Sequence, residues 1–100
     1  MMYSIQYKPR AKKDIKSICD YVEYKHFDPV AAKRFAEGIY AKIDRLKYNA
    51  HIFPISAYQD VRKYDIFARH VVYKGFTIIY SIHGDLVMVH RIIHGSLIQG

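Results

Sequence analysis

The sequence has a single cysteine, no tryptophan and no long apolar run. Cys19 alone cannot form an internal disulfide or a cysteine-based zinc cage, which fits a reducing, cytoplasmic compartment. The apolar runs are only a few residues long, whereas a membrane-spanning helix needs about 20 apolar residues. We therefore do not expect this chain to be a membrane protein. The first residues lack a basic stretch followed by an apolar segment, so we also expect no secretion signal.

Composition and charge narrow the class of protein further. The 100 residues are 51% hydrophobic and 25% charged, which is typical of one folded domain over 1–100 and excludes intrinsic disorder. Sixteen lysines and arginines against nine acidic residues give a net charge of +7. This excess indicates an acidic partner, and charge alone does not choose between nucleic acid and an acidic protein.

The first half of the sequence predicts one strand and two helices. Apolar and polar residues alternate over 3–7, and Pro9 can then begin a helix over about 10–25. Asp28 is a good N-cap and Pro29 suits the first position of a second helix, which we expect to end near Tyr48. Apolar residues recur at helical spacing in both segments: Ala11, Ile15, Ile18, Cys19 and Val22, then Ala32, Phe35, Ile39, Ile43 and Leu46.

The second half predicts a β-meander. Residues 49–68 have a weak pattern and are expected to form a long connection, with a short strand near 61–66. Three segments rich in Val, Ile and Tyr follow, separated by short glycine-containing turns: 69–73, 76–82 and 86–93. The expected order β-α-α-β-β-β is an α+β, two-layer fold, with an N-terminal strand, an antiparallel helical hairpin and a C-terminal antiparallel meander.

Alternation along the strands predicts which side chains face the helices. We expect one face of 76–82 to lie under the helices and the semi-polar face, with Thr77, Ile79 and Ser81, to be open to solvent or a partner. Both faces of the last strand are apolar, which favours a central position. We expect one face of this strand to carry Val87, Val89, Arg91 and Ile93. The strand should end in a cationic rim with Arg91, His94 and Gly95.

Several segments together resemble the ParE/RelE toxins of type II toxin–antitoxin systems. Residues 18–22, 31–35 and 43–46 resemble that family's helical hairpin, and 69–71, 76–80 and 89–95 resemble its sheet. The resemblance extends over about 3–98. It implies a RelE/ParE-like fold and a hetero-oligomer with a cognate acidic antitoxin. It also implies one of two targets: DNA gyrase for ParE-like members, or ribosome-bound mRNA for RelE-like endoribonucleases.

A nuclease needs groups that transfer protons and cations that stabilise the developing phosphorane charge. His94, Arg91, Arg69 and His70 form the candidate catalytic set if the protein cleaves RNA without a metal. Tyr73 or Tyr80 could stack a base, and Arg62 and Lys63 are further candidates for contacting the target or nucleic acid. In the alternative interpretation, the two arginines are sheet-face charges that contact carboxylates, and His94 caps a strand end.

The end of the sequence favours the gyrase target. The ending His94-Gly95 resembles the ParE branch, and Ser96, Leu97, Ile98 and Gln99 supply no second nuclease residue. A ribosome-dependent endoribonuclease is the alternative, and a non-toxic basic binding module is the third hypothesis. We expect no cofactor. A zinc site on His90 and His94 is excluded because four residues of a strand advance about 13 Å.

Overall fold

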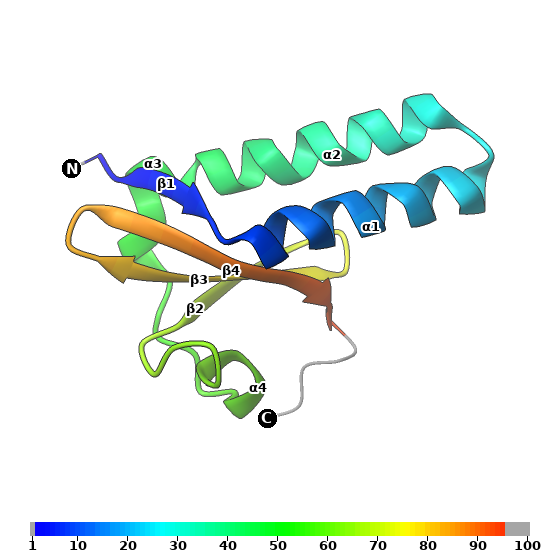
Figure 1. Cartoon of the computed structure of the whole chain (residues 1–100). Coiled ribbons are helices and arrows are strands. Elements are labelled where there is room, and N and C mark those ends of the chain that lie inside the picture. Colours follow the sequence, from blue (N-terminus) through cyan, green and yellow to red (C-terminus); the bar gives the residue numbers. More distant parts are fainter. Residues whose placement is uncertain (1, 96–100) are drawn as a thin grey trace.

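The computed structural model describes residues 2–95, which form a four-stranded sheet crossed on one face by a helical hairpin (Figure 1). The elements in chain order are β1 (Ser4–Tyr7), α1 (Pro9–His26), α2 (Pro29–Asp44), α3 (Leu46–Asn49), a 3-10 turn (Ala50–Ile52), α4 (Gln59–Arg62), β2 (Arg69–Tyr73), β3 (Phe76–His83) and β4 (Leu86–His94). The predicted α+β fold and its element order are confirmed. No helix within residues 2–95 is long and apolar enough to cross a membrane.

The ends of the helical hairpin follow the predicted signals. Pro9 is the first residue of α1, where its missing N–H has no helical partner to lose. Asp28 caps α2, because its side chain accepts a hydrogen bond from the Val30 N–H at 2.9 Å. The helix predicted to reach Tyr48 is divided at Arg45 into α2 and the short α3.

The sheet has the strand order β1-β4-β3-β2, so β4 is central, as predicted. The three C-terminal strands are antiparallel neighbours. β1 pairs with β4 in parallel, from Ser4 opposite Leu86 to Tyr7 opposite Val89, so the sheet is mixed. The helical hairpin and the other two strands lie between these partners in the chain, and such a long connection permits parallel pairing.

The main core lies between the hairpin and the sheet. Its buried side chains include the apolar stripes of both helices and the predicted inner face of β3: Ala11, Ile15, Ile18, Val22, Ala32, Ile39, Ile43, Ile78 and Tyr80. Val87 and Val89 contribute the same layer from β4. The predicted helix-facing side of β3 is therefore confirmed.

The other face of β3 is buried over most of its length, contrary to expectation. Residues 61–66 do not form a strand: Val61 belongs to α4 and forms a second apolar cluster with Ala68 and Ile79. Thr77, Ile79 and Ser81 are all buried. A four-residue helix is too short to produce helical periodicity in the sequence, so the covering of this face was missed.

A β-bulge in β4 changes the alternation that the sequence predicts. Tyr80 pairs with Val89 and Ile79 pairs with Arg91, so the register passes over His90. One extra residue in a strand shifts every later side chain to the opposite face. Ile92 therefore joins the main core, and the prediction that Arg91 and Ile93 share a face with Val89 is wrong.

Candidate functional site

The cationic rim of β4 is attached to the first helix by a carboxylate. β1 reaches only as far as Val89, and beyond this point Asp14 of α1 takes the place of a neighbouring strand. Its Oδ2 accepts the backbone N–H of Ile92 at 3.0 Å. Asp14 therefore satisfies a donor on the sheet edge that would otherwise need water or another chain.

Arg91 makes a bidentate pair with the same carboxylate. Its Nε donates to Asp14 Oδ2 at 2.7 Å and its Nη2 donates to Oδ1 at 3.2 Å. A further Arg91 N–H donates to the Tyr64 hydroxyl at 3.1 Å. The hydrogen bonds to Asp14 raise the pKa of the Arg91 guanidinium. This arrangement matches the alternative interpretation of Arg91 as a sheet-face charge that contacts a carboxylate.

Arg69 is also held by the fold. Its Nη1 donates to the backbone oxygen of His51 at 3.2 Å and to that of Phe53. Tyr80, which is opposite Arg69 on β3, is completely buried, and its hydroxyl donates to the Ala50 oxygen at 2.7 Å. Burial raises the pKa of Tyr80. A buried ring offers no face to a base, so the predicted stacking role does not fit Tyr80 in this structure.

His70 lies on the opposite face of the sheet from Arg69. It pairs with Ile79, and its ring lies 5.7 Å from that of Tyr58. Burial lowers the pKa of His70. Its Nδ1 is buried and has no hydrogen-bond partner among residues 2–95.

His94 lies at the end of β4, at the rim of an apolar groove. Its ring meets the edge of Phe76 at a centroid distance of 5.3 Å. The groove, with a volume of about 290 Å³, is lined by these two residues and by Ser17, Ile18 and Tyr21 of α1. None of its lining residues is among those that bind Arg69.

The structure does not gather the four candidate catalytic residues at one point. Arg69 and Tyr80 point to the hairpin side of the sheet, whereas His70 and Arg91 flank Ile79 on the α4 side. Two strand spacings, about 10 Å, separate His70 from Arg91 across the sheet. Arg91 is also directed at Asp14 of α1, whereas the His70 ring packs against Tyr58, so the two side chains do not converge.

The remaining candidates lie near single members of the catalytic set: Tyr73 is joined to His94 through Phe76, its partner on β3, and Lys63 lies over the same Tyr64 ring as Arg91. The Tyr73 ring packs against Phe35 at 5.6 Å. The Arg62 side chain donates to the Ile66 oxygen at 3.4 Å, and the Lys63 ammonium lies 5.4 Å from the Tyr64 ring centre. Arg62 and Lys63 are exposed and are accessible to a partner.

Sequence reasoning missed two features of this region. Asp14 lies beside the apolar stripe of α1, three residues after Ala11, and a carboxylate at the margin of a buried stripe indicates a cation opposite it. The second feature is a cluster of Asp65, His83 and His90. Among residues 2–95, these three side chains are close enough together to hold a metal ion. The sequence alone does not place His90 beside His83, because only the pairing of β3 with β4 brings these residues onto neighbouring strands.

Comparison with known proteins identifies the family. A family model described as the ParE toxin of the type II toxin–antitoxin system, parDE, matches residues 5–98. The chain belongs to this family of toxins. No curated protein sequence matches it.

Two solved structures are similar to the ParE-family chain in fold. A chain of the chromosomal ParDE toxin–antitoxin system from P. aeruginosa is 18% identical, with a TM-score of 0.75 over 93% of this chain and 96% of that one. A chain of the toxin–antitoxin complex RelBE2 from Mycobacterium tuberculosis is 14% identical, with a TM-score of 0.54 over 94% of this chain and 99% of that one. At these identities, the likenesses show the fold alone.

Proposed function

We propose that this ParE-family toxin arrests growth by acting on DNA gyrase, and that a cognate acidic antitoxin neutralises it in the cytoplasm. The family match over 5–98 supports a toxin, and the geometry of the β4 rim supports a target other than RNA. The observation that carries this choice is the bidentate pair between Arg91 and Asp14. A guanidinium already neutralised by a carboxylate is a poor stabiliser of phosphorane charge.

The other candidate cation supports the same choice. Arg69 donates to two backbone oxygens on the hairpin side of the sheet, away from His70 and Arg91. General acid–base catalysis needs its groups within hydrogen-bond reach of one substrate. A protein that inhibits a large enzyme by binding needs no such cluster, only a complementary surface.

The alternative, a ribosome-dependent endoribonuclease, is favoured by one observation. His94, which carries an imidazole able to transfer protons in catalysis, lines a groove beside the aromatic rings of Tyr21 and Phe76. An unstacked base could enter such a groove and place its ribose near the imidazole. The third hypothesis, a non-toxic basic module, is excluded if expression of the chain stops growth.

The antitoxin is proposed to be an acidic segment that folds on the toxin. The net charge of +7 would accelerate its association, and apolar surface would provide the affinity. The groove at His94 continues into a wider depression of about 530 Å³, which joins the start of α2 to the start of β3 and includes Lys25, Arg34 and Lys74. An acidic chain with apolar anchors matches both parts of this surface.

The function is tested by expressing the chain in bacteria with and without the gene beside its own. We expect growth arrest with double-stranded DNA breaks, both relieved by the neighbouring gene, and equal toxicity of the His94→Ala and control His26→Ala variants. His26 is exposed at the end of α1 and lines the wider depression, so His26→Ala is the control for toxicity and not for neutralisation by the neighbouring gene. New mRNA 5′ ends in translated regions, lost in His94→Ala alone, would support the nuclease. Unimpaired growth would leave only the binding module.

A further inference from the structure

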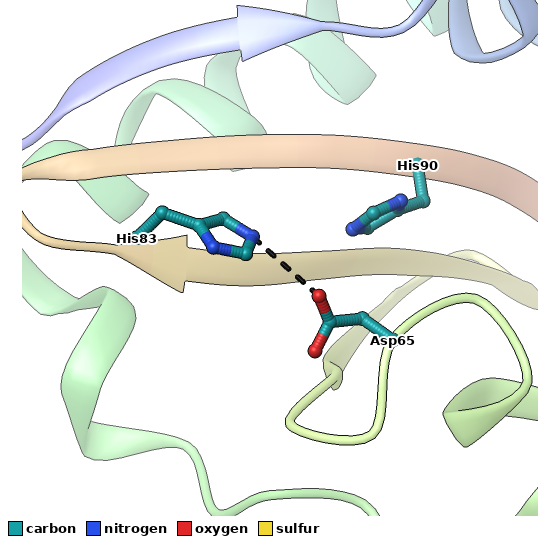
Figure 2. Close-up of side chains that lie close together, drawn as sticks. All are labelled: Asp65, His83 and His90. Atoms are coloured by element: carbon teal, nitrogen blue, oxygen red, sulfur yellow. Dashed lines mark ion pairs between the residues drawn. The ribbon is translucent and has the colours of Figure 1, made fainter.

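Three potential metal ligands meet on the α4 side of the sheet, away from the β4 rim. Asp65 comes from the turn between α4 and β2, His83 ends β3, and His90 is the bulged residue of β4 (Figure 2). One ligand atom from each residue lies within 4.8 Å of the other two. We propose that Asp65, His83 and His90 bind a divalent transition-metal ion of the zinc class.

The local backbone explains why these side chains converge. Ser81 and His83 are two positions apart on β3, so they share a face of the sheet. Ser81 Oγ lies 2.7 Å from Nε2 of His83 and 2.7 Å from Nε2 of His90. Both imidazoles therefore direct the same nitrogen at one point, and a zinc ion needs that kind of convergence.

The third donor is already close to bonding geometry. Asp65 Oδ2 lies 3.6 Å from His83 Nε2. A tetrahedral zinc ion with bonds of about 2.0–2.1 Å holds its ligand atoms about 3.4 Å apart. The site therefore closes by small rotations of the two imidazoles from the Ser81 hydroxyl toward the carboxylate.

The burial of the three residues suits a metal site with access to solvent. His90 is 4% exposed, whereas the His83 side chain is 52% exposed and gives the ion a route from water. Asp65 is fixed in place because its Oδ1 accepts the Phe67 N–H at 2.8 Å, which leaves Oδ2 for the ion. Water would complete the coordination.

The donor set selects the class of ion. Two imidazoles and one carboxylate favour zinc and its first-row neighbours, whereas calcium and magnesium prefer oxygen ligands alone. Because Asp65 belongs to the segment that covers the second face of the sheet, the ion would join this segment to β3 and β4. Binding would stabilise the folded chain by mass action.

The test is calorimetric titration of the untagged, metal-free, full-length chain with ZnCl2, followed by thermal unfolding. We expect one zinc ion per chain, no binding of MgCl2, and a rise in Tm of about 6–11 °C with zinc at ten times its Kd. Co²⁺ in the same site should give the visible absorption of a tetrahedral ion. Zinc binding weaker than millimolar, or at a stoichiometry other than one, would overturn the proposal.

Variants identify the ligands. His83→Ala should weaken zinc binding at least about tenfold, since removing a ligand costs no less than disturbing its supporting contacts. Asp65→Asn keeps the oxygen that accepts the Phe67 N–H and should also weaken binding. His26→Ala is the control, and it should bind zinc like the unsubstituted chain. Equal affinity of His83→Ala and His26→Ala would contradict the assignment, provided that both unfold normally without metal.

Discussion

Arg91 and Asp14 lie 77 positions apart in the sequence and are joined by two hydrogen bonds, at 2.7 and 3.2 Å. The same carboxylate also accepts the Ile92 N–H at the edge of β4. The contact attaches the first helix to the last strand where β1 no longer covers that strand. The contact therefore supports the fold, and the charge of Arg91 has a structural role.

Asp14→Asn is expected to destabilise the protein by about 2–4 kcal/mol, because it leaves a largely buried guanidinium without its counter-charge. The side chains of Arg91 and Asp14 are only 20% and 11% exposed. The free energy of unfolding in urea measures the effect. Asp20→Asn breaks an exposed pair with Lys16 and serves as the control, with a cost below about 1 kcal/mol. Equal losses of unfolding free energy in the two variants would contradict a stabilising role of the contact between Arg91 and Asp14.

Gly38→Ala is expected to destabilise the protein, although alanine favours a helix by about 1 kcal/mol. A Cβ at Gly38 would lie 1.8 Å from the Tyr73 hydroxyl oxygen and 2.5 Å from Cζ. Overpacking of this kind costs about 1–3 kcal/mol, which exceeds the helical gain.

The sign of the Gly38→Ala effect should reverse when the obstacle is removed. In a Tyr73→Ser background, the same substitution should stabilise the chain by about 0.5–1 kcal/mol. Urea unfolding of the four proteins of this double-mutant cycle measures the coupling. If Gly38→Ala were stabilising in both backgrounds, the close approach of α2 and β2 would be wrong.

The stability of the protein should depend on pH through His70. Burial lowers the pKa of His70 in the folded chain, so the unfolded chain binds the proton more readily. The stabilising contribution is complete above the unfolded pKa of about 6.5 and declines as the pH falls below it. Unfolding in urea between about pH 5 and pH 7 should show stability rising with pH, with a smaller slope in His70→Gln.

His90 should retain part of that slope, because burial lowers its pKa too. The comparison is therefore between slopes and does not require the variant to be independent of pH. An unchanged slope in His70→Gln would contradict the inferred burial of its imidazole. A slope of opposite sign would contradict the direction of the pKa change.

Sequence patterns predicted the regular parts of the fold well. Pro9, Asp28 and Pro29 mark helix starts through local chemistry, and each does so in the structure. The turn at Lys74 and Gly75 was equally readable: both residues adopt positive φ, 45° and 83°, as a two-residue hairpin turn requires. Signals of this kind depend only on neighbours in the chain.

The features that sequence patterns missed depend on contacts between distant segments. The bulge at His90 leaves one sign in the sequence of β4. The side chains that face the main core are two positions apart at Val87 and Val89, and the next one, Ile92, follows after three positions. The covering of Ile79 by α4 has no periodic signal. The roles expected for Arg91 and Tyr80 do not fit the structure, because Asp14 and the Ala50 oxygen, which bind these side chains, are distant in the sequence.

The most direct test of the account mixes the purified chain with DNA gyrase, ATP and a supercoiled plasmid, and stops the reaction with detergent and protease. The account predicts linear DNA that appears only with gyrase and disappears when the antitoxin is added. Intact plasmid at every toxin concentration, together with cleavage of mRNA on translating ribosomes, would contradict it.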